Sequence, residues 1–144
     1  MQSSELLLEG FQAWQRFHPD SKSALLASLP LSLGVFAVRR RQPYQLSVGE
    51  SDIAYVGYGT NKKGLRRRVR QCFRPGFSLG RPQSTNIKIL EAIKGPGAFE
   101  LSWLECANAC EARRLVKDLL QRYRNEHGQL PPLRKRMSAC SRAH

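Results

Sequence analysis

The chain has 144 residues, of which 41% are hydrophobic, and this is enough for one domain with a buried core. The formal net charge of +13 favours an anionic partner, and nucleic acid is the usual one. We expect neither a membrane span nor a signal peptide, because no long apolar run is present and the first ten residues carry Glu5 and Glu9. The cysteines form no CxxC pair, so a zinc site is not expected. Reduced thiols are usual in the cytoplasm, and we expect a cytoplasmic or nucleoid-associated protein.

The N-terminal segment, residues 1–28, is predicted to be a helical extension. Leu7, Phe11 and Trp14 follow a helical spacing within residues 4–16, and a second helix is predicted over residues 21–28. Residues 1–30 carry a net charge of −1, so the whole positive excess lies further along the chain. We therefore expect this extension to pack on the domain, or to bind a protein partner or a second copy, rather than to contact nucleic acid.

Two strands are predicted next, over residues 33–38 and 53–58, because both stretches are apolar and rich in β-formers. The connection between them is too short for a crossover helix, so the strands should pair antiparallel. Three arginines at residues 39–41 follow the first strand. They indicate either a solvated strand end or a phosphate contact.

A strongly cationic helix is predicted after the second strand. Leu65, Val69 and Phe73 recur every fourth residue, which is typical of a helix with one buried face. Residues 62–81 contain eight Lys or Arg and no Asp or Glu. The side chains expected to contact nucleic-acid phosphates are Lys62, Lys63, Arg66, Arg67, Arg70 and Arg74.

The rest of the chain is predicted as helix, strand and helix. A loop over residues 74–84 precedes a helix over 86–94, a third strand over 99–104 and a long helix over 109–124. The last ten residues, 135–144, form a basic tail that we expect to be disordered.

Three short motifs in this order resemble the GIY-YIG nuclease family. They are GVF at residues 34–36, YVG at 55–57 and LRRRV at 65–69. The helix, strand and helix that follow keep the family order, and the resemblance covers residues 29–134. It implies an α/β (α+β) fold with a small, mainly antiparallel three-stranded sheet flanked by helices.

The resemblance also implies a reaction and its residues. The family hydrolyses DNA phosphodiester bonds with one divalent metal ion, Mg²⁺ or Mn²⁺, that a Glu holds. Tyr55 matches the Tyr that lies near the attacking water, and Arg68 matches the essential Arg on the phosphate. Glu111 is the candidate metal ligand, since it falls on the first Glu of the family's final helix.

Four family positions carry other residues. Phe36 replaces the Tyr of the first tripeptide, and Cys72 stands where the family has His or Tyr. Val116 falls on the metal-binding Glu, and a Val cannot hold Mg²⁺. Arg134 occupies the place of the family's closing Asn.

Three functions therefore stay open. The chain is a metal-dependent endonuclease with Tyr55, Arg68 and Glu111 as its catalytic residues, or a degenerate module that binds DNA or structured RNA without cutting it. The third alternative is a basic protein whose main role is binding other proteins. The direction in which Glu111 points relative to Tyr55 and Arg68 should separate the first two.

Overall fold

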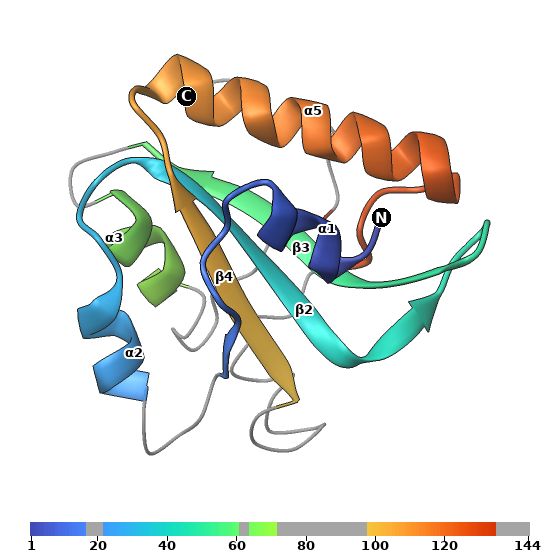
Figure 1. Ribbon diagram of the computed structural model, residues 1–144, viewed down its shortest axis with the longest axis horizontal. Coiled ribbons are helices and arrows are strands. Elements are labelled where there is room, and N and C mark those ends of the chain that lie inside the picture. The colour runs from blue at the N-terminus through green and yellow to red at the C-terminus, as the bar shows by residue number, and fades with distance from the viewer. Residues whose placement is uncertain (17–21, 61–63, 72–97, 135–144) are drawn as a thin grey trace.

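The computed structural model describes residues 1–16, 22–60, 64–71 and 98–134, which form a mixed α/β domain (Figure 1). One antiparallel sheet has the strand order β1-β4-β2-β3. The elements are α1 (Ser3–Leu8), β1 (Gln15–Arg16), α2 (Lys22–Ser28), β2 (Gly34–Gln45), β3 (Glu50–Gly59), α3 (Gly64–Gln71), β4 (Phe99–Glu105) and α5 (Ala109–His127). The expected three-stranded sheet is thus wrong by one strand, because the short β1 pairs with β4.

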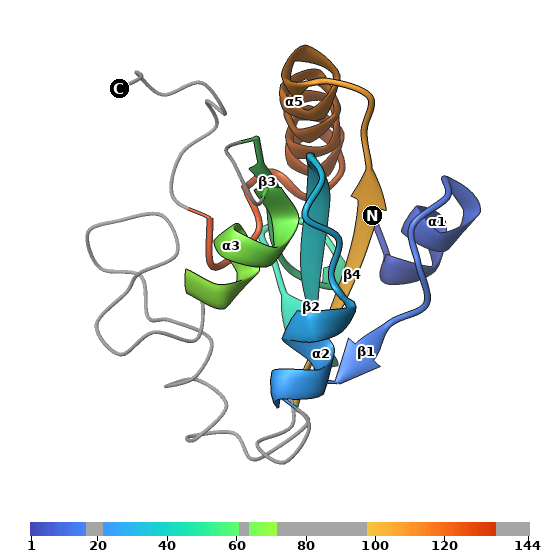
Figure 2. The same ribbon diagram turned by 90° about the vertical axis from the view of Figure 1, so that its left-hand side faces the viewer.

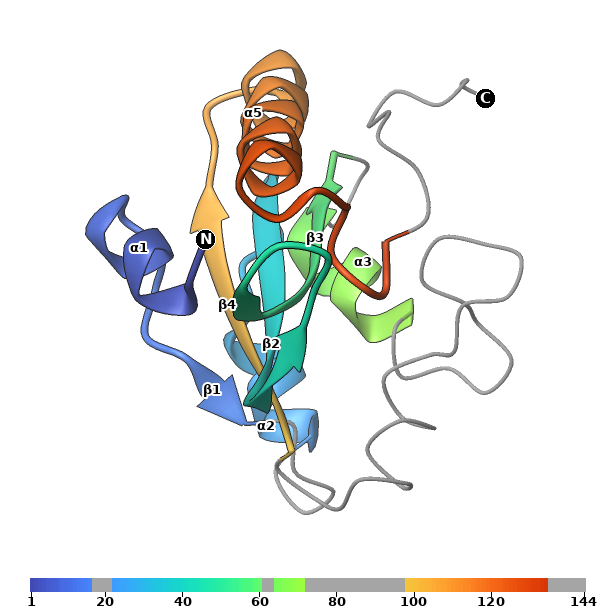
Figure 3. The same ribbon diagram turned by 90° about the vertical axis from the view of Figure 1, so that its right-hand side faces the viewer.

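The sheet separates two hydrophobic clusters, which follow the alternation of side chains along β2. Val35 and Ala37 face a cluster that contains the buried side of α5 and residues of α1. Phe36 and Val38 face the other cluster, with residues of α2 and α3. Figure 1 shows α5 along one face of the sheet and α2 and α3 against the other, while Figures 2 and 3 show α1 and α3 on opposite sides of the molecule.

The predicted long N-terminal helix is wrong beyond Leu8. Gly10 adopts φ +102°, a left-handed conformation that suits glycine and ends the helical path. The chain then runs extended, so that Gln15 pairs with Leu101 of β4. Leu6, rather than Leu7, faces the core. The N-terminal segment is therefore built into the same core as the rest of the domain.

The other predicted elements within the described residues are present. β2 and β3 pair antiparallel as expected, and β2 continues through the three arginines to Gln45. α5 begins after Asn108, whose side-chain oxygen accepts a hydrogen bond from the Glu111 N–H at 2.8 Å. The helix predicted over residues 86–94 and the tail 135–144 lie outside the described residues. No helix in the described part of the chain is long and apolar enough to cross a bilayer.

Candidate nucleic-acid interface

The glycines of the two tripeptides allow β2, β3 and α3 to approach closely. A Cβ on Gly57 would lie 2.7 Å from Cε2 of Tyr55 and 3.1 Å from the Phe36 ring. A Cβ on Gly34 would lie 2.7 Å from Cδ1 of Leu65, the first buried leucine of α3. Both distances are too short for a side chain, so these positions need glycine for packing.

Tyr55 and Arg68 meet where β3 packs against α3. The Tyr55 hydroxyl accepts a hydrogen bond from Nη2 of Arg68 at 3.4 Å, and the Phe36 ring lies 5.8 Å from the Tyr55 ring, centroid to centroid. The Tyr55 side chain is only 2% exposed, whereas Arg68 is partly exposed. The buried phenol therefore supports the guanidinium of Arg68, whose Nη1 also donates to Oε1 of Gln71 at 3.2 Å.

Tyr55 reaches this face of the sheet through its pairing with Val38, and a β-bulge in β3 lies directly before it. Val38 of β2 pairs with Tyr55 and the next residue, Arg39, pairs with Ile53, so Ala54 is the extra residue. Ala54 and Tyr55 consequently both belong to the cluster under α2 and α3. The Ala54 carbonyl is satisfied by the N–H of Leu133 at 2.9 Å.

Arg134 also lies at Tyr55, which the helical and strand patterns did not indicate. Its Nη1 donates to the carbonyl of Val56 at 2.9 Å, and its guanidinium carbon lies 5.7 Å from the centre of the Tyr55 ring. The segment that carries it runs along the outer edge of β3 and satisfies outward carbonyls there. The only signal in the sequence was that Arg134 occupies the family's closing position.

Besides Arg68, the arginines of α3 divide into two groups. Arg66 donates to the carbonyls of Leu29 at 2.9 Å and Ala27 at 3.0 Å, and so ties α3 to the C-terminal end of α2. Arg67 and Arg70 are exposed and make no ion pair with any residue that the structure describes. These two side chains form the outward cationic surface of α3.

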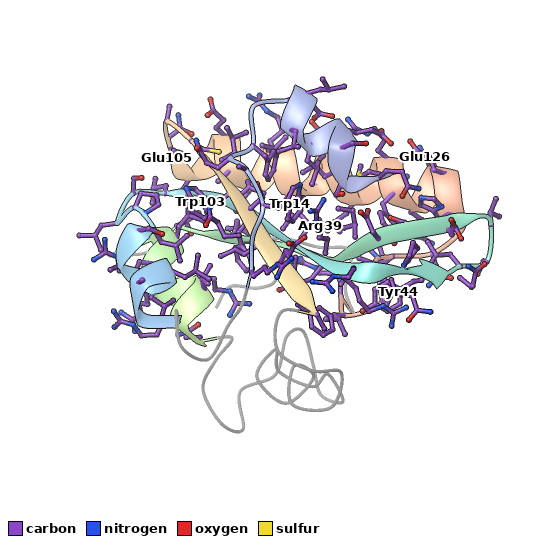
Figure 4. The ribbon with its side chains drawn as sticks, turned by 60° about the horizontal axis from the view of Figure 1, so that its bottom comes forward. Trp14, Arg39, Tyr44, Trp103, Glu105 and Glu126 are labelled. Atoms are coloured by element: carbon purple, nitrogen blue, oxygen red, sulfur yellow. The ribbon has the colours of Figure 1, made fainter. Side chains whose placement is uncertain are left out.

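The arginine triplet of β2 is largely engaged within the protein. Arg39 pairs with Glu100 at 2.6 Å and lies 4.7 Å from the Trp14 ring, and Figure 4 shows the Arg39 and Trp14 side chains together. Arg40 lies 3.5 Å from the centre of the Tyr44 ring and donates to nearby backbone carbonyls. Arg41 is exposed. The first two arginines thus stabilise the long strand through contacts within the protein, which neither the solvated strand end nor the phosphate contact anticipated.

Glu111 lies in the first turn of α5, on the helix that packs against the other face of the sheet from Tyr55 and Arg68. Its carboxylate accepts a hydrogen bond from the Ala107 N–H at 2.9 Å, which closes a capping arrangement with Asn108. Burial raises the pKa of the Cys106 thiol, and the neighbouring Glu111 carboxylate raises it further. In this position Glu111 supports the start of α5.

The described residues do not fit a divalent metal ion beside Tyr55 and Arg68. Val116, which the resemblance aligns with a metal-binding Glu, is fully buried between α5 and the sheet. Across residues 1–16, 22–60, 64–71 and 98–134, no group of three or more His, Cys, Asp or Glu could hold a metal ion. Mg²⁺ requires oxygen ligands, and this part of the chain does not gather them at Tyr55.

Three of the predicted phosphate contacts and one substituted family position fall outside the described part of the chain. Lys62, Lys63, Cys72 and Arg74 belong to this group. Within the described part, the structure brings together Tyr55, Arg68 and Arg134, and it places Glu111 elsewhere.

Comparison of the chain with protein-family models, with curated proteins and with solved structures finds no match.

Proposed function

We propose that this chain is a DNA-binding module of the GIY-YIG type, which contacts the phosphate backbone through the outward face of α3. The fold supports the assignment in its order of elements: the first tripeptide lies on the inner strand β2, the second on its neighbour β3, and the arginine helix follows. The inner position of β2 between β3 and β4 suits the compact sheet expected for the family.

The observation that carries the proposal is the direction of the α3 side chains. Leu65 and Val69 are fully buried and mark the buried side of the helix. At 100° per residue, Arg67 projects about 180° from the direction midway between Leu65 and Val69, and Arg70 projects about 120° from it. They therefore point away from the core. Arginines in this position can neutralise phosphates without losing an internal partner.

Side-chain hydrogen bonds hold α3 in place on the domain. Arg66 fixes the helix to α2 through two carbonyls, and Tyr55 orients Arg68 from below. A phosphate contact by a preoriented side chain costs less conformational entropy than one by a freely rotating side chain. We expect Arg68 to contact a phosphate beside Arg67 and Arg70, with Tyr55 as its positioning residue.

A metal-dependent endonuclease is the second candidate, and the contact between Tyr55 and Arg68 favours it. The two residues keep the family's pairing of a Tyr with an essential Arg. The position of Glu111 as a cap of α5 on the far face of the sheet, together with the buried Val116, favours the binding module instead. A plasmid-nicking assay with Mg²⁺ or Mn²⁺ separates the two: Arg68-dependent nicking by the wild-type protein would establish the endonuclease.

The test of binding is fluorescence anisotropy with a labelled DNA duplex over a series of salt concentrations. Arg67→Gln/Arg70→Gln should weaken binding and reduce the slope of log K against log salt by about 1.8, since each phosphate contact contributes about 0.9. A normal slope in this variant, or salt-insensitive binding by the wild type, would refute the α3 interface. Tighter binding to a structured RNA than to the duplex would reassign the partner.

A matched control removes the same charge elsewhere. Arg16→Gln/Arg122→Gln also lowers the net charge by two, but these arginines pair with carboxylates: Arg16 with Glu100 at 3.7 Å and Arg122 with Glu9 at 2.5 Å. The control should keep the wild-type salt slope. An equal loss in both variants would mean that net charge alone, and not the α3 face, determines binding.

A further inference from the structure

A second cationic surface runs along α5, and neither the sequence motifs nor the proposed function uses it. Arg114, Lys117 and Arg124 are exposed, and none of them makes an ion pair with a residue in the described ranges. At 100° per residue they fall within about 80° of one another around the helix, with the neutral Gln121 between them. We call these three side chains the α5 stripe.

The α5 stripe points to solvent. The buried residues of α5 occupy another side of the helix, where Val116, Leu119 and Tyr123 pack against the sheet. Asp118 is also exposed and lies about 40° around the helix from Arg114, at the edge of the stripe that faces Arg122. The stripe therefore places three cations on the solvent side of the longest helix that the structure describes, with one carboxylate at its edge.

The α5 stripe and the outward surface of α3 lie on opposite sides of the sheet. α5 packs on one face of the sheet and α3 on the other, so the sheet lies between them (Figure 1). A DNA duplex is stiff over about 150 bp. One short duplex consequently cannot lie on both surfaces, whereas two separate duplexes can.

We propose that the α5 stripe binds a second DNA duplex, so that one chain bridges two duplexes. The inference rests on the proposed function, because the first duplex is the one at α3. The stripe extends about 15 Å along the helix, from the rise of 1.5 Å per residue. Duplex DNA carries one charge per about 1.7 Å of its axis, so several phosphates lie within reach of three cations.

The test is a capture experiment that needs both surfaces at once. A short duplex of about 20 bp, well below the stiffness length of DNA, is fixed to beads and incubated with protein and a second, labelled duplex. Arg114→Gln/Lys117→Gln should lose most of the captured label and bind one duplex per chain instead of two. Its affinity for a single duplex at α3, measured by anisotropy, should remain within about threefold of wild type, since the α3 contacts are unchanged.

The controls separate this inference from the proposed function. Arg16→Gln/Arg122→Gln removes the same charge and should still capture the labelled duplex. The inference is overturned if Arg114→Gln/Lys117→Gln still captures the labelled duplex. Two chains that join through another surface would give this result. Absence of capture by the wild type overturns it as well. If the wild type binds no duplex at all, the proposed function is refuted instead.

Discussion

Replacing Val116 by a glutamate tests whether the position that the GIY-YIG resemblance aligns with a metal-binding Glu lies in the core. Val116 is 0% exposed and lies in the cluster between α5 and the sheet. A carboxylate there has no water, and burial raises the pKa of such a group by up to about 3–5 units. At about 1.4 kcal/mol per unit, ionising it in the folded protein costs about 4–7 kcal/mol. This is a large share of the roughly 5–15 kcal/mol that stabilises a typical domain.

The penalty should depend on pH, and its sign follows from the direction of the shift. In Val116→Glu the folded-state pKa of the introduced carboxyl group is raised above its unfolded value of about 4.3. The ionisation penalty is therefore absent below that pH and is complete above the folded-state pKa. Val116→Gln is the matched control, because it introduces a side chain of the same shape without a charge. The two variants should unfold at similar urea concentrations near about pH 4, and Val116→Glu should be far less stable near about pH 8.

Urea unfolding followed by circular dichroism at both pH values measures this difference. Equal midpoints for the two variants near about pH 8 would show that the side chain reaches water, and would refute the buried position of Val116. Stabilisation of Val116→Glu, but not of Val116→Gln, by millimolar Mg²⁺ would refute the reasoning in another way. It would mean that position 116 joins oxygen ligands for a metal ion, as the family resemblance implies.

Three further predictions concern single residues. Gly57→Ala should lower the free energy of unfolding by about 1–3 kcal/mol, measured by urea unfolding, because the new Cβ would lie 2.7 Å from the Tyr55 ring. Tyr55→Phe removes the hydroxyl that accepts the Arg68 hydrogen bond, so it should weaken duplex binding by up to about tenfold and lower the free energy of unfolding by about 1 kcal/mol. Duplex binding that is unchanged by fluorescence anisotropy would contradict the positioning role. Burial raises the pKa of Tyr123 to about 12. The wild type should therefore lose stability between pH about 10, the ordinary tyrosine value, and pH about 12, and Tyr123→Phe should show less of this loss in urea titrations.

The local sequence was sufficient for most of the elements that the structure describes. The apolar runs that become β2 and β3, joined by a short connection, could pair only as neighbours in antiparallel orientation. The helical spacing of Leu65 and Val69 indicated the buried side of α3, and therefore also the outward direction of Arg67 and Arg70. These features depend on contacts between residues that are close in the chain.

The N-terminal segment shows where local patterns no longer suffice. Phe11 is buried as its hydrophobic character suggests, but it reaches the core from an extended segment and not from a helix. The left-handed Gly10 and the pairing of Gln15 with Leu101 decided this, and the partner strand lies far away in the sequence. Helical spacing over a few residues cannot anticipate a strand partner of that kind.

The sequence by itself determined the cationic character of the chain, the order of its main strands and helices, and the candidates Tyr55, Arg68 and Glu111. Only the tertiary structure decided which of them meet. Pairing of Tyr55 with Val38 of β2 places Tyr55 on the face of the sheet that α3 covers, where it meets Arg68 and Arg134, while packing of α5 on the far face leaves Glu111 as a helix cap. The physical reason is that a side chain's face in a sheet depends on strand register, and register is fixed by long-range pairing rather than by the local sequence.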